Sequence, residues 1–278
     1  MLPLDKYTKW LPKIEENARL YLSEKEYQAF SLISAEQKKG QLKAILEKPI
    51  ANFTVINELY FRAKWAEVLQ TIQSKDGFKL LEVASGDADM IPQVMARIHP
   101  SSHYFTANMN KILNESLLAK TKDLPLKIAI IEDDASAIGD HIGQEVIDII
   151  AFQHSINDVI QAILCEQEGV DTVYSDWMET LPKMIELLQK EIFNNTFEQH
   201  ARVPFLKLIN GLLKVLKKDG FMVMSHYMFQ LDLDWGYPLE LFANIIPITR
   251  EWIKELENCQ EVFFKDFHSH WWIFLQKR

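Results

Sequence analysis

Residues 78–90, FKLLEVASGDADM, decide the fold of this chain. An apolar run from Phe78 to Val83 breaks at Ala84-Ser85-Gly86, and a helical pattern follows it. This succession predicts a buried strand, a tight turn and the start of a helix. In open α/β sheets, such a turn at the carboxyl end of a parallel strand holds nucleotide-like ligands. We therefore expect a ligand site at this turn.

The residues of the turn favour one kind of ligand. A dinucleotide needs several glycines for close approach of the backbone to its pyrophosphate, and only Gly86 is present. Asp87 and Asp89 flank the helix start, where they would repel a phosphate but suit a cation. S-adenosylmethionine has no phosphate and carries a sulfonium and an ammonium group. It therefore suits this turn better than a dinucleotide does; the alternative is that the turn is an ordinary strand-turn-helix corner.

Composition limits the remaining function classes. With 278 residues, of which 48% are hydrophobic and 25% charged, the chain can bury a large core. The net charge is −9 and no basic block is long, which argues against a nucleic-acid substrate. Cys165 and Cys259 form neither a metal-binding spacing nor a disulfide framework. No signal peptide and no apolar run of about 18 residues is visible, so we expect a cytoplasmic protein that does not bind membranes.

The chain divides into two predicted parts. Residues 1–73 have few glycines, and their apolar residues recur at spacings of three and four, which predicts a helical appendage. Ser23 and Ser34 are expected helix caps. In the last helix of this part, residues 57–72, we expect five residues to face inward: Leu59, Tyr60, Ala63, Val68 and Leu69.

Residues 74–278 alternate apolar runs with helical patterns, which predicts a parallel sheet covered on both faces. A longer helical insertion falls around 170–200. Near the end, 239–259 is helical with an interruption at Pro247, and two short runs indicate a closing hairpin. The expected strands are 78–83, 103–106, 126–131, 146–152, 221–225, 261–264 and 271–275.

Two stretches resemble a known family. Glu82 to Ala88 resembles the first motif of the class I (Rossmann-like) S-adenosylmethionine-dependent methyltransferases, an acidic residue before a G-x-G-x-G-like turn. Alanine stands at the first and third glycine positions. Leu212 to Ser225 resembles the helix, basic turn and fifth strand of the same family, with Asp219 in place of a glycine. The resemblance, which is to small-molecule members, implies a seven-stranded, mostly parallel sheet with an antiparallel last strand.

The resemblance also implies a cofactor site. After the second strand, Asn108 stands where the family has an acid that accepts hydrogen bonds from the ribose; its amide oxygen can accept but carries no charge. Asp134 stands where the family contacts the adenine amino group. Asn108 could instead cap the next helix, and Asp134 could lie in a solvated turn. The implied cofactor-binding residues are Glu82, Ala84, Ser85, Gly86, Asn108, Met109, Asp134, Ala135 and Gln153.

Two histidines are the catalytic candidates. His154 follows the fourth strand and His226 the fifth, and a neutral imidazole can accept a proton from a substrate oxygen or nitrogen. Either could instead make a structural hydrogen bond. Tyr21, Trp177 and Tyr227 are the expected substrate contacts. Tyr21 belongs to the helical appendage, which the family resemblance assigns as a lid. Trp177 belongs to the 170–200 insertion, whose expected position beside the carboxyl ends of the strands predicts a second lid. The alternative is that both segments only pack on the core.

The predicted function is methyl transfer to an oxygen or nitrogen atom of a small, partly apolar molecule in a lidded cleft. In-line transfer from a sulfonium needs alignment and exclusion of water, and a base only when the acceptor arrives protonated. No metal is implied. Two rivals remain: another sulfonium-donor transferase such as an aminopropyltransferase, and an inactive methyltransferase fold used for binding or as a scaffold. The chain could act alone or as a homodimer.

Overall fold

The computed structural model describes residues 5–47, 50–73 and 75–278, which divide into two compact units. The first, named here the helical unit, holds the described residues up to 73 together with Tyr227–Trp235. The second, named the sheet unit, holds Lys75–His226 and Gly236–Arg278. The sequence predicts a boundary after residue 73 but not the return of Tyr227–Trp235 to the first unit.

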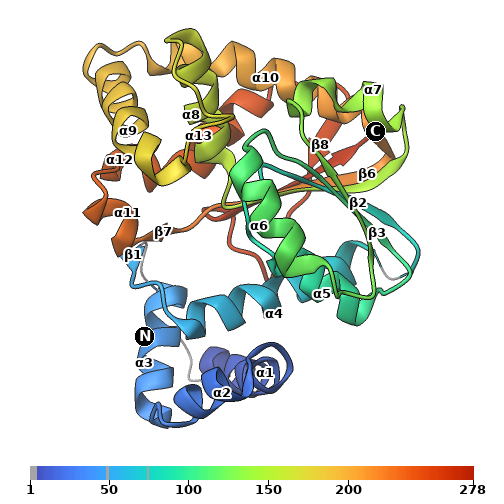
Figure 1. Ribbon diagram of the computed structural model, residues 1–278, viewed down its shortest axis with the longest axis vertical. Helices are drawn as coiled ribbons and strands as arrows, with labels where there is room; N and C mark the ends of the chain where they lie inside the picture. Colours follow the sequence, from blue (N-terminus) through green and yellow to red (C-terminus); the bar gives the residue numbers. More distant parts are fainter. Residues whose placement is uncertain (1–4, 48–49, 74) are drawn as a thin grey trace. The chain divides into compact units, whose positions relative to one another are not determined.

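The helical unit is built around α4 (Val55–Ile72), against which α1 (Asp5–Tyr21) and α3 (Ala35–Glu47) pack (Figure 1). The five residues predicted to face inward on α4 are all buried. Ser23 caps the next helix, as predicted, through a capping box with Glu26. The remaining elements of this unit are α2 (Glu24–Ser31), β1 (Ile50–Ala51), β7 (Met228–Phe229) and α11 (Gln230–Asp234).

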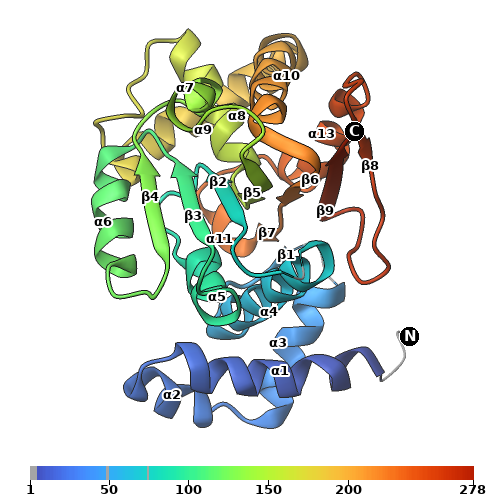
Figure 2. The same ribbon diagram turned by 90° about the vertical axis from the view of Figure 1, so that its right-hand side faces the viewer.

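The sheet unit contains seven strands in the order β4-β3-β2-β5-β6-β9-β8, which Figure 2 shows from left to right. The five strands from β4 to β6 run parallel, and β9 lies antiparallel between β6 and β8. This confirms the predicted mostly parallel sheet with an antiparallel last strand. The strands are β2 (Lys79–Val83), β3 (His103–Ala107), β4 (Lys127–Ile131), β5 (Ile147–Gln153), β6 (Leu216–Ser225), β8 (Cys259–Glu261) and β9 (Trp272–Lys277).

Helices flank this sheet, and the predicted insertion is largely one helix, α9, which packs against α8 and α10. The helices of the sheet unit are α5 (Met90–Ile98), α6 (Lys111–Thr121), η1 (Ala135–Ala137), α7 (Ile138–Ile142), α8 (Ile156–Gln167), α9 (Trp177–Phe193), α10 (Phe197–Val215), α12 (Leu239–Phe242) and α13 (Ile245–Ile253). Within the described residues, no helix has both the length and the apolar character that a membrane span requires.

Two predicted boundaries are wrong for identifiable reasons. The helical stretch near the end breaks at Ala243 and Asn244, and Pro247 lies inside α13. A proline is tolerated in the first turn of a helix, because the backbone N–H that it lacks would have no partner there. The penultimate strand is Cys259–Glu261 rather than 261–264, although Val262 still donates to the Phe274 carbonyl at 2.8 Å.

The strand β6 begins five residues earlier than predicted, so the basic turn belongs to the strand itself. Asp219 has a left-handed backbone with φ of 62°. A Cβ on the following Gly220 would lie 2.9 Å from the carbonyl oxygens of Asp148 and Lys217. The strand therefore needs glycine at 220 because another backbone approaches it closely.

Candidate functional site

The parallel strands of the sheet unit end in register. Val83 of β2 pairs with Ala107 of β3, which pairs with Ile131 of β4. On the other side, Gln153 of β5 pairs with Ser225 of β6. The segments that follow these five strands therefore lie along one edge of the sheet, named here the carboxyl edge.

The turn after β2 has an unusual backbone. Ala84 and Gly86 are both left-handed, with φ of 52° and 58°. Gly86 adopts this conformation freely, whereas Ala84 bears a cost of about 1 kcal/mol. A Cβ on Gly86 would meet only the Leu113 side chain, at 3.6 Å, so the backbone conformation rather than space requires the glycine. Strain of this kind at Ala84 is typical of turns that bind ligands.

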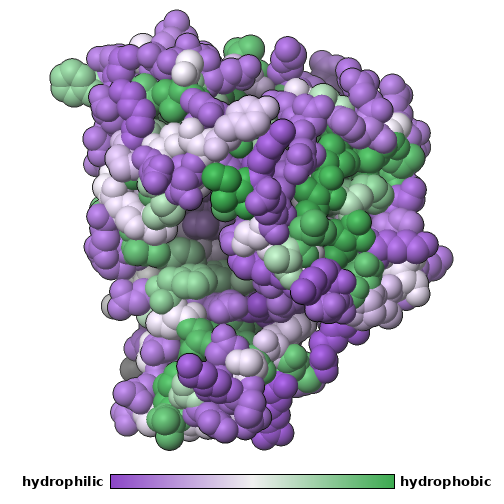
Figure 3. Space-filling view, viewed as in Figure 1, coloured by the Kyte–Doolittle hydropathy of each residue, from purple (hydrophilic) through white to green (hydrophobic). Residues whose placement is uncertain are grey.

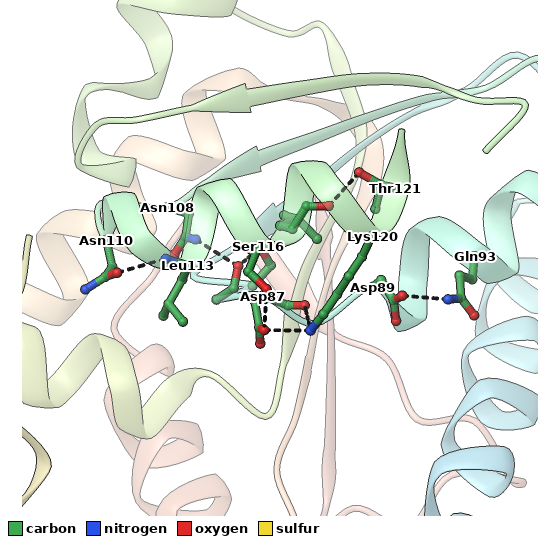
Figure 4. A network of polar contacts seen from close by, with 12 residues as sticks. Asp87, Asp89, Gln93, Asn108, Asn110, Leu113, Ser116, Lys120 and Thr121 are labelled. Atoms are coloured by element: carbon green, nitrogen blue, oxygen red, sulfur yellow. Dashed lines mark hydrogen bonds and ion pairs between the residues drawn. The ribbon is translucent and has the colours of Figure 1, made fainter. Parts of the chain in front are cut away.

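Asp87 of this turn is tied to α6 (Figure 4). Lys120 Nζ donates to Asp87 Oδ2 at 2.6 Å, and Ser116 Oγ donates to the same oxygen at 2.9 Å. Burial alone would raise the pKa of the Asp87 carboxyl, but these two hydrogen bonds outweigh it and lower the pKa. The carboxylate is thus ionised and paired with Lys120. Asp87, which the sequence predicts to suit a cationic ligand, is thus already paired with a lysine of the protein.

Asn108 holds the turn rather than capping the next helix. Its Nδ2 donates to the Gly86 carbonyl at 2.9 Å and to Asn114 Oδ1 at 2.7 Å (Figure 4). The cap of α6 is Asn110, whose Oδ1 accepts from Leu113 N at 3.0 Å. The alternative that made Asn108 the cap is therefore wrong. Its Oδ1 makes no hydrogen bond to the described residues and can accept one from a hydroxyl.

A polar layer lies beneath the turn. Tyr104 donates its hydroxyl hydrogen to Glu82 Oε2 at 2.7 Å, and the hydroxyls of Ser85 and Thr106 lie 2.8 Å apart. Burial raises the pKa of Glu82 to about 8, against the opposing hydrogen bond from Tyr104. Glu82 is therefore mostly protonated at neutral pH, and its carboxyl supports the turn from within the core.

The segment after β4 carries the other acidic candidate. Asp134 is exposed and caps η1 by accepting from Ser136 N at 2.6 Å, while Ala135 is buried. Asp133 accepts from His141 Nε2 at 2.8 Å, and this hydrogen bond lowers the pKa of Asp133. The solvated turn considered from the sequence is present, and it leaves Asp134 accessible.

The two histidines meet at the ends of β5 and β6. Their rings stack with centroids 4.5 Å apart and planes 11° from parallel. His154 is half-buried, and its backbone is left-handed with φ of 57°. Its backbone N–H donates to the Ser225 carbonyl at 2.8 Å. Gln153, also half-buried, directly precedes it.

His226 is 1% exposed, and neither ring nitrogen has a hydrogen-bond partner among the described residues. Burial, with the neighbouring His154 charge, holds the pKa of His226 well below its ordinary value. The buried imidazole is therefore neutral at physiological pH. Leaving it unbonded costs about 1–3 kcal/mol, which a hydrogen-bonding ligand would recover.

Sequence reasoning missed a polar patch on α8. Tyr237 donates its hydroxyl hydrogen to Gln161 Oε1 at 3.1 Å, while Gln161 Nε2 and Asn157 Oδ1 are buried with no partner among the described residues. The Tyr237 ring contacts Phe242, which in turn lies edge-on to His226. The available signal was the spacing of Asn157 and Gln161, four apart on the inward face of an amphipathic helix.

The remaining candidates are distributed over both units. Trp177 begins α9 in the sheet unit and is half-buried, as is Met109 before α6. Tyr21 and Tyr227 belong to the helical unit, where Arg62 lies over the Tyr21 ring at 5.2 Å and the Tyr227 ring lies 4.7 Å from that of Phe61. Across the described parts of the chain, no three His, Cys, Asp or Glu side chains are grouped so that they could hold a metal ion.

No protein-family model and no curated protein matches this chain. Solved structures do. A putative S-adenosylmethionine-dependent methyltransferase from Methanococcus maripaludis matches with a TM-score of 0.51 at 10% identity, over 87% of this chain and 92% of its own. A methyltransferase from Aquifex aeolicus has a TM-score of 0.48 at 10% identity, over 77% and 88% of the two chains. The CurJ carbon methyltransferase also scores 0.48 at 10% identity, over 100% and 71%.

At 10% identity, the match to the Methanococcus maripaludis structure shows the fold alone. The Methanococcus maripaludis structure extends over most of both chains, and the strand order with an antiparallel last strand agrees with the arrangement implied by the sequence resemblance. The chain therefore has the Rossmann-like fold of the class I S-adenosylmethionine-dependent methyltransferases.

Proposed function

We propose that the protein is an S-adenosylmethionine-dependent methyltransferase that acts on an oxygen or nitrogen atom of a small, partly apolar molecule. The observation that carries this proposal is the carboxyl edge of the sheet. The strained turn after β2, the accessible Asp134 after β4 and the stacked histidines after β5 and β6 all lie along it. Fold likeness alone would not assign an activity.

The residues of this edge fit the cofactor. The Oδ1 of Asn108 suits a ribose hydroxyl, and the exposed carboxylate of Asp134 suits the adenine amino group. The turn through Ala84 and Gly86 would hold the amino-acid portion. When bound, the cofactor would supply a methyl group activated by its sulfonium. Gln153 and Met109 would line the same site.

The two histidines would together bind the acceptor's proton and remove it. Burial keeps His226 neutral and disfavours its protonated form, so its imidazole can accept a hydrogen bond from a hydroxyl or amine group of the acceptor but is a weak base. His154 stacks on it and is half-buried, which gives the pair a more exposed member. An acceptor that hydrogen-bonds His226 would also satisfy its unbonded ring nitrogens.

The neighbours of His226 support a partly apolar acceptor. Phe242 and Tyr237 offer aromatic surface, and Gln161 Nε2 offers an unused donor. Trp177, Tyr21 and Tyr227 remain predicted substrate contacts. The lid roles of α9 and of the helical unit remain predictions as well.

Calorimetric titration with S-adenosylmethionine and S-adenosylhomocysteine tests the cofactor site. We expect both to bind the wild-type protein, and Asp134→Ala to weaken binding by about 10-fold, the value of one hydrogen bond to a charged group. Asp140→Ala, which removes another exposed carboxylate from the sheet unit, is the matched control. Folded protein that gives no heat with either ligand would refute the proposal and favour the scaffold role.

A second measurement separates transfer from binding. Labelled methyl incorporation into panels of small phenols, hydroxy acids and amines should reveal an acceptor. Tight cofactor binding with no turnover of any acceptor would favour a binding protein. Preference for decarboxylated S-adenosylmethionine over the parent would favour the aminopropyltransferase alternative.

A further inference from the structure

The strand β4 forms an open edge of the sheet. In the described structure it pairs only with β3, so one side of its backbone faces outward. Asn108 N donates to the Ile131 carbonyl, which directs residue 131 toward β3. Because backbone direction alternates along a strand, Ile128 and Ile130 direct their N–H and C=O groups outward, and the same alternation continued one residue past β4 gives Glu132 this direction. Such a row is a template for another strand.

A groove lined by five apolar and five polar residues runs beside the same strand. It has a volume of about 530 Å³ and lies between β4 and α6. Figure 3 shows hydrophobic side chains gathered over these two elements, to the right of the centre of the view. Leu118 of α6 is 59% exposed. The side chains from the strand side of the groove are Leu124, Leu126, Ile128, Ile130 and Glu132.

The opposite edge of the sheet contrasts with β4. That edge is β8, only three residues long, and its Glu261 is held by Arg250 at 2.9 Å. Short edges with charged side chains resist pairing. β4 is longer, and after Lys127 it continues with Ile128, Ala129, Ile130 and Ile131. One edge is thus protected and the other is apolar and open.

We propose that β4 is the interface of a homodimer, in which two copies of β4 pair antiparallel about a twofold axis through Ile130. A twofold axis that relates two antiparallel strands of one sheet stands perpendicular to that sheet. Even-numbered residues of one strand therefore face even-numbered residues of the other, and odd-numbered residues face odd-numbered ones. Ile130 then exchanges hydrogen bonds with Ile130 of the partner subunit. Ile128 does so with the partner's Glu132, and the two sheets become continuous.

Charge complementarity selects a second copy as the occupant and fixes this register. Lys127 falls opposite the partner's Asp133, and the pair occurs twice by symmetry. Lys127 lies in β4 and Asp133 two residues beyond its end, so the pair falls at a position without backbone hydrogen bonds when the strand pairing extends over both residues. Asp133 stays ionised because the hydrogen bond from His141 lowers its pKa. If the twofold axis instead passed through Ala129, Lys127 would lie opposite the partner's Ile131, and both Lys127–Asp133 pairs would be lost.

Sedimentation velocity over a range of protein concentrations tests the interface. We expect a dimer for the wild-type chain. Ile130→Lys sets two lysines together at the axis and should raise the dimer dissociation constant by about 100-fold or more. Lys127→Asp sets like charges opposite each other twice and should raise it by about 10-fold. The swap Lys127→Asp with Asp133→Lys should restore it. Lys218→Asp, an exposed change outside β4, is the control.

Hydrogen exchange gives an independent readout. The amides of Ile128, Ile130 and Glu132 should be protected only at concentrations where the dimer forms. Those of Ala129 and Ile131, which face β3, should be protected at all concentrations. A wild-type chain that stays monomeric over the whole range of protein concentrations overturns the proposal. So does a dimer unaffected by Ile130→Lys in a variant with native circular dichroism.

Discussion

The ring centroids of His154 and His226 lie 4.5 Å apart, although the two residues are 72 positions apart in the chain. Pairing of Gln153 with Ser225 at the ends of β5 and β6 brings them together. One ring is half-buried and the other fully buried with no hydrogen bond to the described residues. A stable fold has no need of such a pair, so it marks the part of the site where we place the acceptor.

Replacement of the buried ring separates stability from function. His226→Phe keeps the stacking surface and removes two unsatisfied nitrogens, so the free energy of unfolding should rise by about 1 kcal/mol. Methyl transfer should fall by about 100-fold, as expected when one member of the histidine pair that binds and removes the acceptor's proton is lost. Urea unfolding and turnover measure both. His268→Phe, at an exposed site, should leave methyl transfer unchanged. A marked loss of stability in His226→Phe would show that the imidazole serves the fold.

The left-handed turn offers a test of strain. Ala84 has φ of 52°, so Ala84→Gly should raise the free energy of unfolding by about 0.5–1 kcal/mol. Ala88→Gly, in the same turn at a residue without positive φ, should lower it because glycine only adds freedom to the unfolded chain. Denaturant titration of both variants decides this. Equal effects of the two changes would mean that Ala84 is not strained.

The buried Glu82 makes stability depend on pH. Its pKa is raised from 4.5 to about 8 in the folded protein, so between these values the folded state holds a proton that the unfolded state releases. Stability should therefore fall as pH rises from about 5 to about 8, by up to about 1.4 kcal/mol per unit. Above pH 8 the effect of this group levels off.

Glu82→Gln should remove this dependence while keeping an acceptor for the Tyr104 hydroxyl. At pH 7 the variant should be more stable than the wild type by roughly 3 kcal/mol, and at pH 4.5 nearly equal to it. Unfolding by urea at several pH values provides the measurement. Parallel pH profiles for the two proteins would place the titrating group elsewhere.

The class I methyltransferases usually have an acidic residue at the position of Asn108. The structure explains why an acidic side chain would be unfavourable at this position. Asn108 Nδ2 donates to two acceptors, Gly86 O and Asn114 Oδ1. Asn108→Asp replaces that donor with a carboxylate facing them, so it should cost about 1–3 kcal/mol of stability. Cofactor binding should weaken as the turn loosens. Asn194→Asp, at an exposed site, is the control. Tighter cofactor binding by Asn108→Asp would contradict this account.

Several elements followed from local sequence because their physical basis is local. The strands of a sheet that is covered on both faces are continuous apolar runs. For that reason β2 and β5 could be predicted from the sequence. The five residues of α4 that were predicted to face inward are buried, but packing on its other faces also buries Arg62, Lys64 and Trp65, which the periodicity did not indicate. Ser23 followed from its capping chemistry. The errors lay at element boundaries: Pro247 was expected to interrupt a helix but lies in the first turn of α13, where a proline is tolerated.

The sequence by itself determined the alternation of strands and helices, the turn at 84–86 and the strand ends on which site residues stand, because periodicity and turn chemistry depend on near neighbours. Tertiary structure alone decided the partners of these residues. It paired Asp87 with Lys120, turned Asn108 onto Gly86, buried His226 against His154 and joined Tyr227 to the helical unit. Burial and contacts between distant positions depend on how the whole sheet packs, and a linear pattern does not encode them.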